Sequence, residues 1–127
     1  FDLAGFEQLS IRTAIATDTG GGTSFSMLRT LDEAYKIQQM RNHSLNPLQS
    51  IYWATLGNAC ALGLDNEVGS LKEGMFADII VLDSRATALS NIRMETCENL
   101  NEELFVLQTL GDDRFIKAVY VAGIKYR

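Results

Sequence analysis

The 127-residue sequence contains few of the residues that catalytic and metal sites usually need. It has one histidine, one proline and two cysteines. With His43 as the only histidine, a histidine-based metal site, a Ser/His/Asp triad or a Cys/His dyad cannot be complete within the chain. His43 itself lies in an Asn-His-Ser break between two predicted helices, so we expect a solvated loop residue.

The cysteines, Cys60 and Cys97, are far apart and have no CxxC partner. In apolar surroundings such residues are typically reduced and behave as small buried hydrophobes. The N-terminus shows no charged region followed by an apolar one, as a signal peptide would. We therefore expect a cytoplasmic protein. Because the chain begins at Phe1 without an initiator methionine, we also expect a fragment.

Basic clusters and long apolar runs are also missing. The net charge is −5, and no group of lysines and arginines suits a phosphate backbone. No apolar run approaches the roughly 20 residues of a membrane-spanning helix. These absences argue against nucleic-acid and membrane partners. Hydrophobic residues make up 46% of the chain and charged residues 21%, which indicates a folded globular domain and not a disordered one.

The periodicity of apolar residues predicts an α/β chain in two parts that meet near residues 64–66. In the first part we expect a short helix or loop over 1–9, a buried strand over 11–17, a helix from Ser24 or Ser26 to about Arg41, and a helix opened by Asn46-Pro47 and ended near Gly63. In the second part we expect strands over 79–82 and 116–121, a helix over 100–110 and a turn at Ala122-Gly123. Because their runs are apolar on both faces, we expect residues 79–82 and 119–121 to be buried in one small sheet.

Asp18 is the candidate functional residue. It follows the predicted strand and precedes three consecutive glycines, which is where α/β folds commonly place their chemistry. Glycines allow backbone N–H groups to approach a ligand closely. The alternative is that the carboxylate accepts hydrogen bonds from the loop's own amides, as in an Asx-turn. The residues alone leave both interpretations open.

The remaining carboxylates and aromatics favour structural roles. The adjacent pairs Asp32-Glu33, Glu102-Glu103 and Asp112-Asp113 fall on predicted solvated faces or turns. Tyr52 and Trp53 lie on an apolar helix and are expected in a core or an interface.

Several motifs together resemble guanine deaminases of the metal-dependent amidohydrolase superfamily. Residues 16–27, ATDTGGGTSFSM, resemble the segment (G/A)TD-x-GGGTSFSM of these enzymes, and residues 1–3 resemble the end of the preceding segment. Residues 68–83, VGSLKEGMFADIIVLD, are similar to a signature shared by many amidohydrolases. Residues 103–114 and 120–123 resemble the guanine-deaminase C-terminus. The resemblance covers the whole chain.

That resemblance implies a fold larger than this chain. The family has a (β/α)₈ barrel and a small β-sandwich assembled from both chain ends. Residues 1–65 would form the C-terminal end of the barrel, with 11–17 as its last strand and two helices after it. Residues 66–127 would form the C-terminal part of the composite β-sandwich. A barrel needs about 250 residues, so this chain cannot close one.

The resemblance also implies the chemistry. The intact enzyme would be a zinc-dependent hydrolase that converts guanine and water to xanthine and ammonia, and it would be a homodimer. Asp18 would be a zinc ligand and a catalytic residue that carries a proton. The histidine ligands and the residues that read guanine would lie upstream of Phe1, so this fragment alone should be inactive. The alternatives are another amidohydrolase acting on a different amino-heterocycle, or a non-catalytic assembly or interaction fragment.

Overall fold

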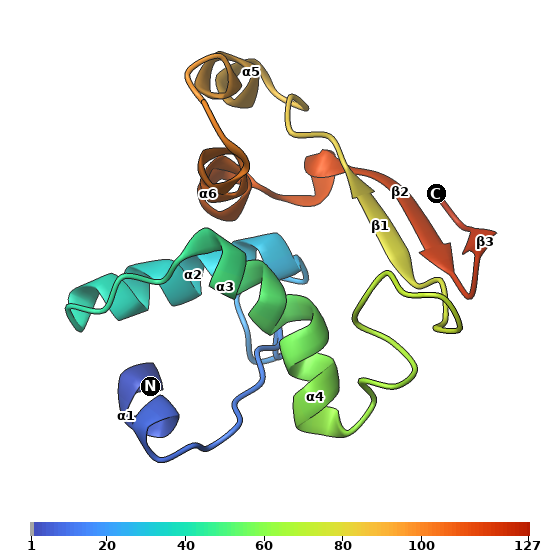
Figure 1. The fold of residues 1–127 in the computed structure, drawn as a ribbon. Helices are drawn as coiled ribbons and strands as arrows, with labels where there is room; N and C mark the ends of the chain where they lie inside the picture. The colour runs from blue at the N-terminus through green and yellow to red at the C-terminus, as the bar shows by residue number, and fades with distance from the viewer. Residues whose placement is uncertain (1) are drawn as a thin grey trace.

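Helices dominate the first half of the chain, and a small antiparallel sheet with two further helices forms the second half (Figure 1). The computed structural model describes residues 2–127, so Phe1 lies outside the described residues. In chain order the elements are α1 (Leu3–Gln8), α2 (Met27–Met40), α3 (Pro47–Tyr52), η1 (Trp53–Gly57), α4 (Asn58–Leu62), β1 (Ile79–Leu82), α5 (Ala88–Met94), α6 (Leu100–Leu110), η2 (Asp113–Phe115), β2 (Ile116–Val121) and β3 (Ile124–Lys125).

The helix boundaries follow from local capping chemistry. The Asn46 side chain accepts a hydrogen bond from the amide of Leu48 at 2.9 Å, and Pro47 occupies the first helical position, as predicted. Gly63 ends α4 in the left-handed conformation, with φ of 72°. Helix α5 was not predicted, although Thr87 and Ser90 form a capping box at its start.

The helix that follows Pro47 contains a π turn. Between α3 and α4, residues Trp53–Gly57 adopt i→i+5 hydrogen bonding as η1. Gly57 is buried there, and a Cβ at its position would lie 3.0 Å from the carbonyl oxygen of Tyr52. The absence of a side chain at Gly57 therefore allows the wider turn to close.

Residues 11–18 form no strand, so the prediction of a strand over 11–17 is wrong for this structure. A strand is defined by a ladder of backbone hydrogen bonds to a neighbour, and no described segment lies alongside to supply one. The β-branched composition indicated an extended chain, but it could not provide a partner.

The sheet has the order β1-β2-β3, with both pairs antiparallel. The predicted strands over 79–82 and 116–121 are confirmed, and they pair with each other. Their predicted burial is wrong: the side chains of Ile80, Val81 and Val121 are 56%, 39% and 48% exposed. Consecutive strand residues such as Ile80 and Val81 point to opposite faces, so apolar side chains meet solvent on both faces of this sheet.

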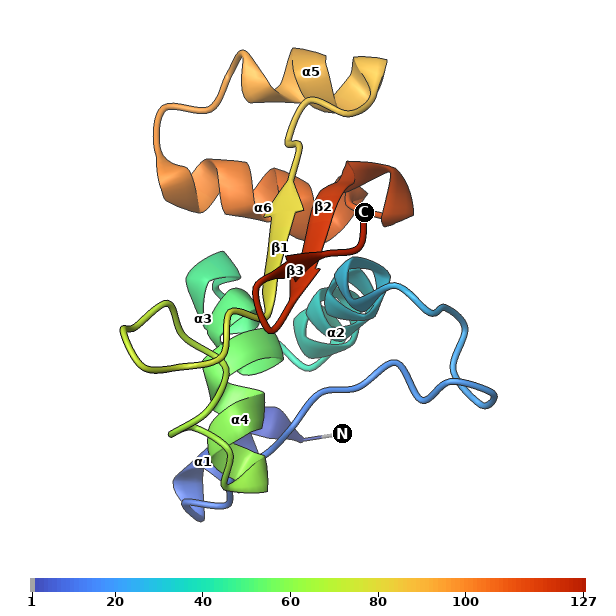
Figure 2. The same ribbon diagram turned by 90° about the vertical axis from the view of Figure 1, so that its right-hand side faces the viewer.

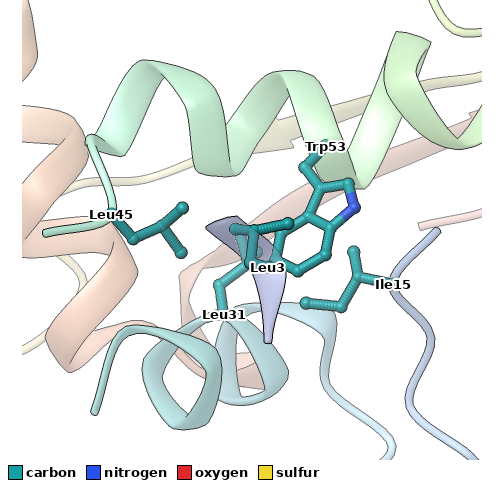
Figure 3. Close-up of a cluster of buried hydrophobic side chains, with 5 residues drawn as sticks. All are labelled: Leu3, Ile15, Leu31, Leu45 and Trp53. Atoms are coloured by element: carbon teal, nitrogen blue, oxygen red, sulfur yellow. The ribbon is translucent and has the colours of Figure 1, made fainter. Parts of the chain in front are cut away.

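Two clusters of buried side chains hold the helices together. The first, which we call the Trp53 cluster, joins α1, residues 11–18, α2 and the helix after Pro47 (Figure 3). The second, which we call the Phe115 cluster, lies between α2, α5, α6 and η2. The buried members are Leu3, Ile15, Leu31, Leu45 and Trp53 in the first, and Leu28, Met94, Val106, Leu107 and Phe115 in the second. Trp53 is thus a core residue as predicted, whereas Tyr52 is half exposed.

Within residues 2–127, no helix has the length and apolar character needed to cross a membrane.

Candidate functional site

Asp18 lies at the end of the extended residues 11–18, where the chain enters the glycine loop. Figure 2 shows the segment between α1 and α2, in blue, as a long loop that extends beyond the start of α2. Its backbone has a positive φ of 50°, which is uncommon for a residue other than glycine. Non-glycine residues in this region often mark functional sites, where surrounding structure maintains a less favourable backbone conformation. The exposed Asp18 side chain stands beside the loop, away from both cores.

A backbone turn shapes the loop after Asp18. The amides of Gly21 and Gly22 both donate to the carbonyl oxygen of Asp18, at 2.9 and 2.6 Å. A Cβ at Gly22 would overlap the carbonyl oxygen of Thr17, so this tight turn requires glycine there. Gly22, and Gly20 with its φ of 105°, are therefore needed for the local path of the chain.

The carboxylate of Asp18 forms no hydrogen bond or ion pair with any residue from 2 to 127. The Asx-turn alternative required the loop amides to donate to this carboxylate. They donate instead to the backbone carbonyl of the same residue. The structure thus leaves both carboxylate oxygens available to an external partner.

The extended residues before Asp18 are held by side chains from the neighbouring helix. The indole N–H of Trp53 donates to the carbonyl oxygen of Thr13 at 3.0 Å. The Asn58 side chain accepts from the amide of Ile15 at 2.8 Å and donates to the carbonyl oxygen of Ile15 at 2.7 Å. These contacts replace part of the backbone ladder that a strand would have.

Sequence reasoning did not identify Asn58 as important. A signal was present, because asparagine is disfavoured inside helices and this one lies between Gly57 and Ala59 in an otherwise apolar stretch. An asparagine at such a position indicates that its amide has a specific partner. The identity of that partner, Ile15, required the tertiary structure.

The other singled-out residues do not join Asp18. His43 is half-buried, and its Nε2 is buried without a hydrogen-bond partner among the described residues, so the prediction of a solvated histidine is wrong. Asp32 was predicted on a solvated face but is buried, with an ion pair of 2.6 Å to Lys36. The charged end of Lys36 reaches solvent, which allows helix α2 to bury its partner. Cys60 and Cys97 are free thiols and half-buried.

The described residues provide one possible metal ligand at this loop and not a complete site. Among residues 2–127, no three His, Cys, Asp or Glu side chains form a group that could hold a metal ion. A zinc site generally needs three or four protein ligands. The exposed, unbonded carboxylate of Asp18 is chemically suited to one ligand position, and any further ligands would have to come from outside these residues.

Comparison with known proteins gives a consistent set of similarities. A family model described as "Amidohydrolase family" matches residues 3–125. The guanine deaminase of Escherichia coli strain K12 is 42% identical over 123 residues, which are 97% of this chain and 28% of that protein. The chain thus spans well under a third of the length of this relative.

Solved structures agree with the sequence comparison. The structure of E. coli guanine deaminase matches with a TM-score of 0.98 and 41% identity, over 100% of this chain and 30% of the other. A guanine deaminase from C. acetobutylicum, solved with bound guanine in its active site, matches with a TM-score of 0.75 and 26% identity, over 98% and 29%. An adenosine deaminase from Xanthomonas campestris with bound zinc shares the fold, with a TM-score of 0.75 and 23% identity over 94% and 26%.

Proposed function

Because the chain belongs to the amidohydrolase family, we propose that it forms part of a guanine deaminase, which hydrolyses guanine to xanthine and ammonia. The observation that carries the proposal is the match to E. coli guanine deaminase over nearly the whole chain, in both sequence and structure. The substrate would be guanine, and the intact enzyme would be a homodimer.

We propose that the two parts of the chain belong to different domains of that enzyme. Residues 1–65 would form the C-terminal end of a (β/α)₈ barrel, with 11–17 as the last barrel strand. Residues 66–127 would form part of a composite β-sandwich. Two observations support this division: 11–18 is extended without a strand partner, and the sheet exposes apolar side chains such as Ile80.

Asp18 is the proposed catalytic residue and a zinc ligand in this enzyme. Zinc, when bound, would supply Lewis-acid activation of water near neutral pH. The Asp18 carboxylate, free of partners within residues 2–127, can accept a proton and pass it to the departing ammonia. Its place at the end of an extended segment, beside a glycine turn, leaves room for a substrate to approach.

The test is steady-state deamination of guanine by the protein that contains this chain, with Asp18→Asn compared with Asp78→Asn. Asparagine keeps the shape of Asp18 but cannot carry the charge or the proton, so kcat should fall by about 10²–10⁴ while the melting temperature stays unchanged. The carboxylate of Asp78 accepts a hydrogen bond at 2.7 Å from the amide of Ala122, which lies in the turn between β2 and β3. Its replacement should therefore lower stability more than turnover.

Each outcome bears on a separate part of the proposal. Near-normal turnover by Asp18→Asn would remove Asp18 from the mechanism. A wild-type enzyme that deaminates another amino-heterocycle faster than guanine would overturn the substrate assignment. A protein that deaminates none of them would favour a non-catalytic role in assembly.

A further inference from the structure

The side-chain amide of Asn58 pairs with the backbone of Ile15 as a neighbouring strand residue would. It accepts from the amide of Ile15 at 2.8 Å and donates to the carbonyl of the same residue at 2.7 Å. In an antiparallel sheet, two directly opposed residues exchange the same two kinds of hydrogen bond. Asn58 therefore satisfies both backbone groups of one residue in a segment that has no strand partner among residues 2–127.

The π turn places Asn58 and Trp53 on one side of their helix. In a regular α-helix, residues five apart lie about 140° apart around the axis. In a π turn, with its i→i+5 hydrogen bond, residues five apart lie close to one full turn apart and so on the same side of the helix. Residues Trp53–Gly57 form a π turn. Both side chains consequently reach the same extended segment, where their targets Thr13 and Ile15 are two residues apart and so point the same way.

Ile15 is the last residue before Asp18 with a hydrogen bond to another element. Residues 16–25 have only local hydrogen bonds: Thr17 to Thr19, the amides of Gly21 and Gly22 to Asp18, and the amide of Ser26 to Ser24. The next hydrogen bonds to another element come at Ser26, whose carbonyl accepts from Thr30 of α2. Among residues 2–127, Ile15 is thus the last point at which a hydrogen bond to another element holds the chain before the Asp18 turn. The side chain of Ile15 is also buried against Trp53, which reinforces the same anchor.

We propose that Asn58 is a positioning residue for Asp18. By holding both backbone groups of Ile15, it fixes the end of the extended segment and so the place of the Asp18 carboxylate relative to the substrate. This inference rests on the proposed role of Asp18 in guanine deamination. A carboxylate displaced by about 1 Å from its productive geometry can reduce a rate by about 10².

The experiment compares Asn58→Ala with Val106→Ala in the whole protein that contains this chain. Val106 is buried in the Phe115 cluster, so its truncation lowers stability without touching residues 11–18. For Asn58→Ala we expect kcat for guanine to fall tenfold to a hundredfold, as an order of magnitude, with KM changed less than about threefold. Val106→Ala should lower the melting temperature and leave kcat near the wild-type value.

A double-mutant cycle separates positioning from a general loss of structure. If Asn58 acts through Asp18, adding Asn58→Ala to Asp18→Asn should reduce kcat by less than about twofold further, because the group that it positions is already lost. Equal losses in both backgrounds would show a role independent of Asp18 and overturn the inference. A normal kcat for Asn58→Ala would overturn it as well.

Hydrogen–deuterium exchange provides a readout that does not depend on activity. Asn58→Ala should raise the exchange rate of peptides covering residues 13–18 at least tenfold, whereas Val106→Ala should leave them unchanged. Unchanged exchange in Asn58→Ala would overturn the anchoring role. If the wild-type protein fails to deaminate guanine, the proposed function fails, and exchange alone then decides whether Asn58 holds this segment.

Discussion

Residues 11–18 and strand β1 (79–82) have similar sequences and opposite environments. Both are rich in β-branched residues, and strands were predicted over 11–17 and 79–82. Strand β1 pairs with β2 through a backbone ladder, from Ile79 opposite Tyr120 to Leu82 opposite Ile116. Residues 11–18 are held instead by side-chain hydrogen bonds to the helical segment after Pro47. Trp53 donates to Thr13, Asn58 donates to Ile15, and Arg12 donates to the carbonyl of Cys60.

Within residues 2–127, the side chains of a helix hold an extended segment that has no ladder of its own. A ladder fixes a strand along its whole length, whereas side-chain contacts fix it only where they occur. Here they occur at Arg12, Thr13 and Ile15, and the chain is held by local turns beyond that point. Such an arrangement leaves Asp18 close to a rigid anchor and exposed to solvent.

The largest effect should come from removing the anchor at Trp53. Trp53→Ala deletes a buried aromatic side chain of the Trp53 cluster, and we expect the free energy of unfolding to fall by about 3–5 kcal/mol. Trp53→Phe keeps most of the apolar volume but loses the donor to Thr13, so a loss of about 1–2 kcal/mol is expected. Chemical denaturation of both variants checks the values. Equal losses would mean that packing contributes little to holding residues 11–18.

Ile80→Thr should have an intermediate effect that tests the proposed sandwich. The Ile80 side chain is 56% exposed within residues 2–127. If it is equally exposed in the whole protein, Thr in its place would change the free energy of unfolding by no more than about 0.5 kcal/mol. If another layer covers the sheet in the whole protein, a buried hydroxyl should cost about 1–3 kcal/mol, and this is the outcome we expect. Lys117→Thr, at an exposed position of β2, serves as the control. A change as small as the control's would contradict the covering layer.

The smallest effect concerns the entry into β2, and it depends on pH. Hydrogen bonds from Arg114, with Nη2 at 2.6 Å from Oδ2, hold the pKa of Asp112 below its ordinary value. The folded state therefore binds fewer protons at this carboxyl than the unfolded state does. The stabilisation by the charged form of Asp112 is present above the unfolded pKa and is lost as the pH falls through the folded pKa. Asp112→Asn should lower stability by about 1 kcal/mol or less at pH 7.

The same substitution should matter progressively less as the pH falls below the ordinary range of a carboxyl group and the wild-type carboxyl also becomes protonated. Denaturation curves of both proteins across this range check the prediction. Glu103→Gln, at an exposed position of α6 whose side chain has no hydrogen bond or ion pair among residues 2–127, provides the matched control for charge removal. A difference between wild type and Asp112→Asn that stays constant with pH would contradict the assigned cause.

Local signals in the sequence were sufficient for most helices and for the sheet. Asn46-Pro47 and Gly63 act through neighbouring backbone groups, so their capping roles could be predicted. Leu100–Leu110 matches its predicted bounds because its apolar residues repeat at helical spacing. Exposure of Ile80 and the missing ladder at 11–18 could not be predicted, since both depend on what lies beside a segment in space.

The sequence pointed to Asp18 as a candidate residue, which stays a prediction, and it pointed to none of the contacts around it. Asp18 was singled out because a carboxylate after a predicted strand and before three glycines lies where α/β folds commonly place their chemistry. That Gly21 and Gly22 bond its carbonyl, and that Asn58 anchors Ile15, depends on backbone geometry and on contacts 43 residues apart. The burial of Asp32 was missed because its long cationic partner Lys36 shields it from a distance of one helical turn.

The left-handed backbone of Asp18 has a consequence for how this position can change over generations. Asn, Gly and Asp tolerate a positive φ better than other residues, whereas β-branched and bulky residues are strained there. Selection for folding alone would therefore accept Asn or Gly at position 18 as readily as Asp. Only selection for the proposed chemistry would retain the carboxylate. Variants with Asn or Gly at position 18 should accumulate as stable, well-expressed proteins without turnover. The abundance of the protein and its activity would then vary independently at this one position.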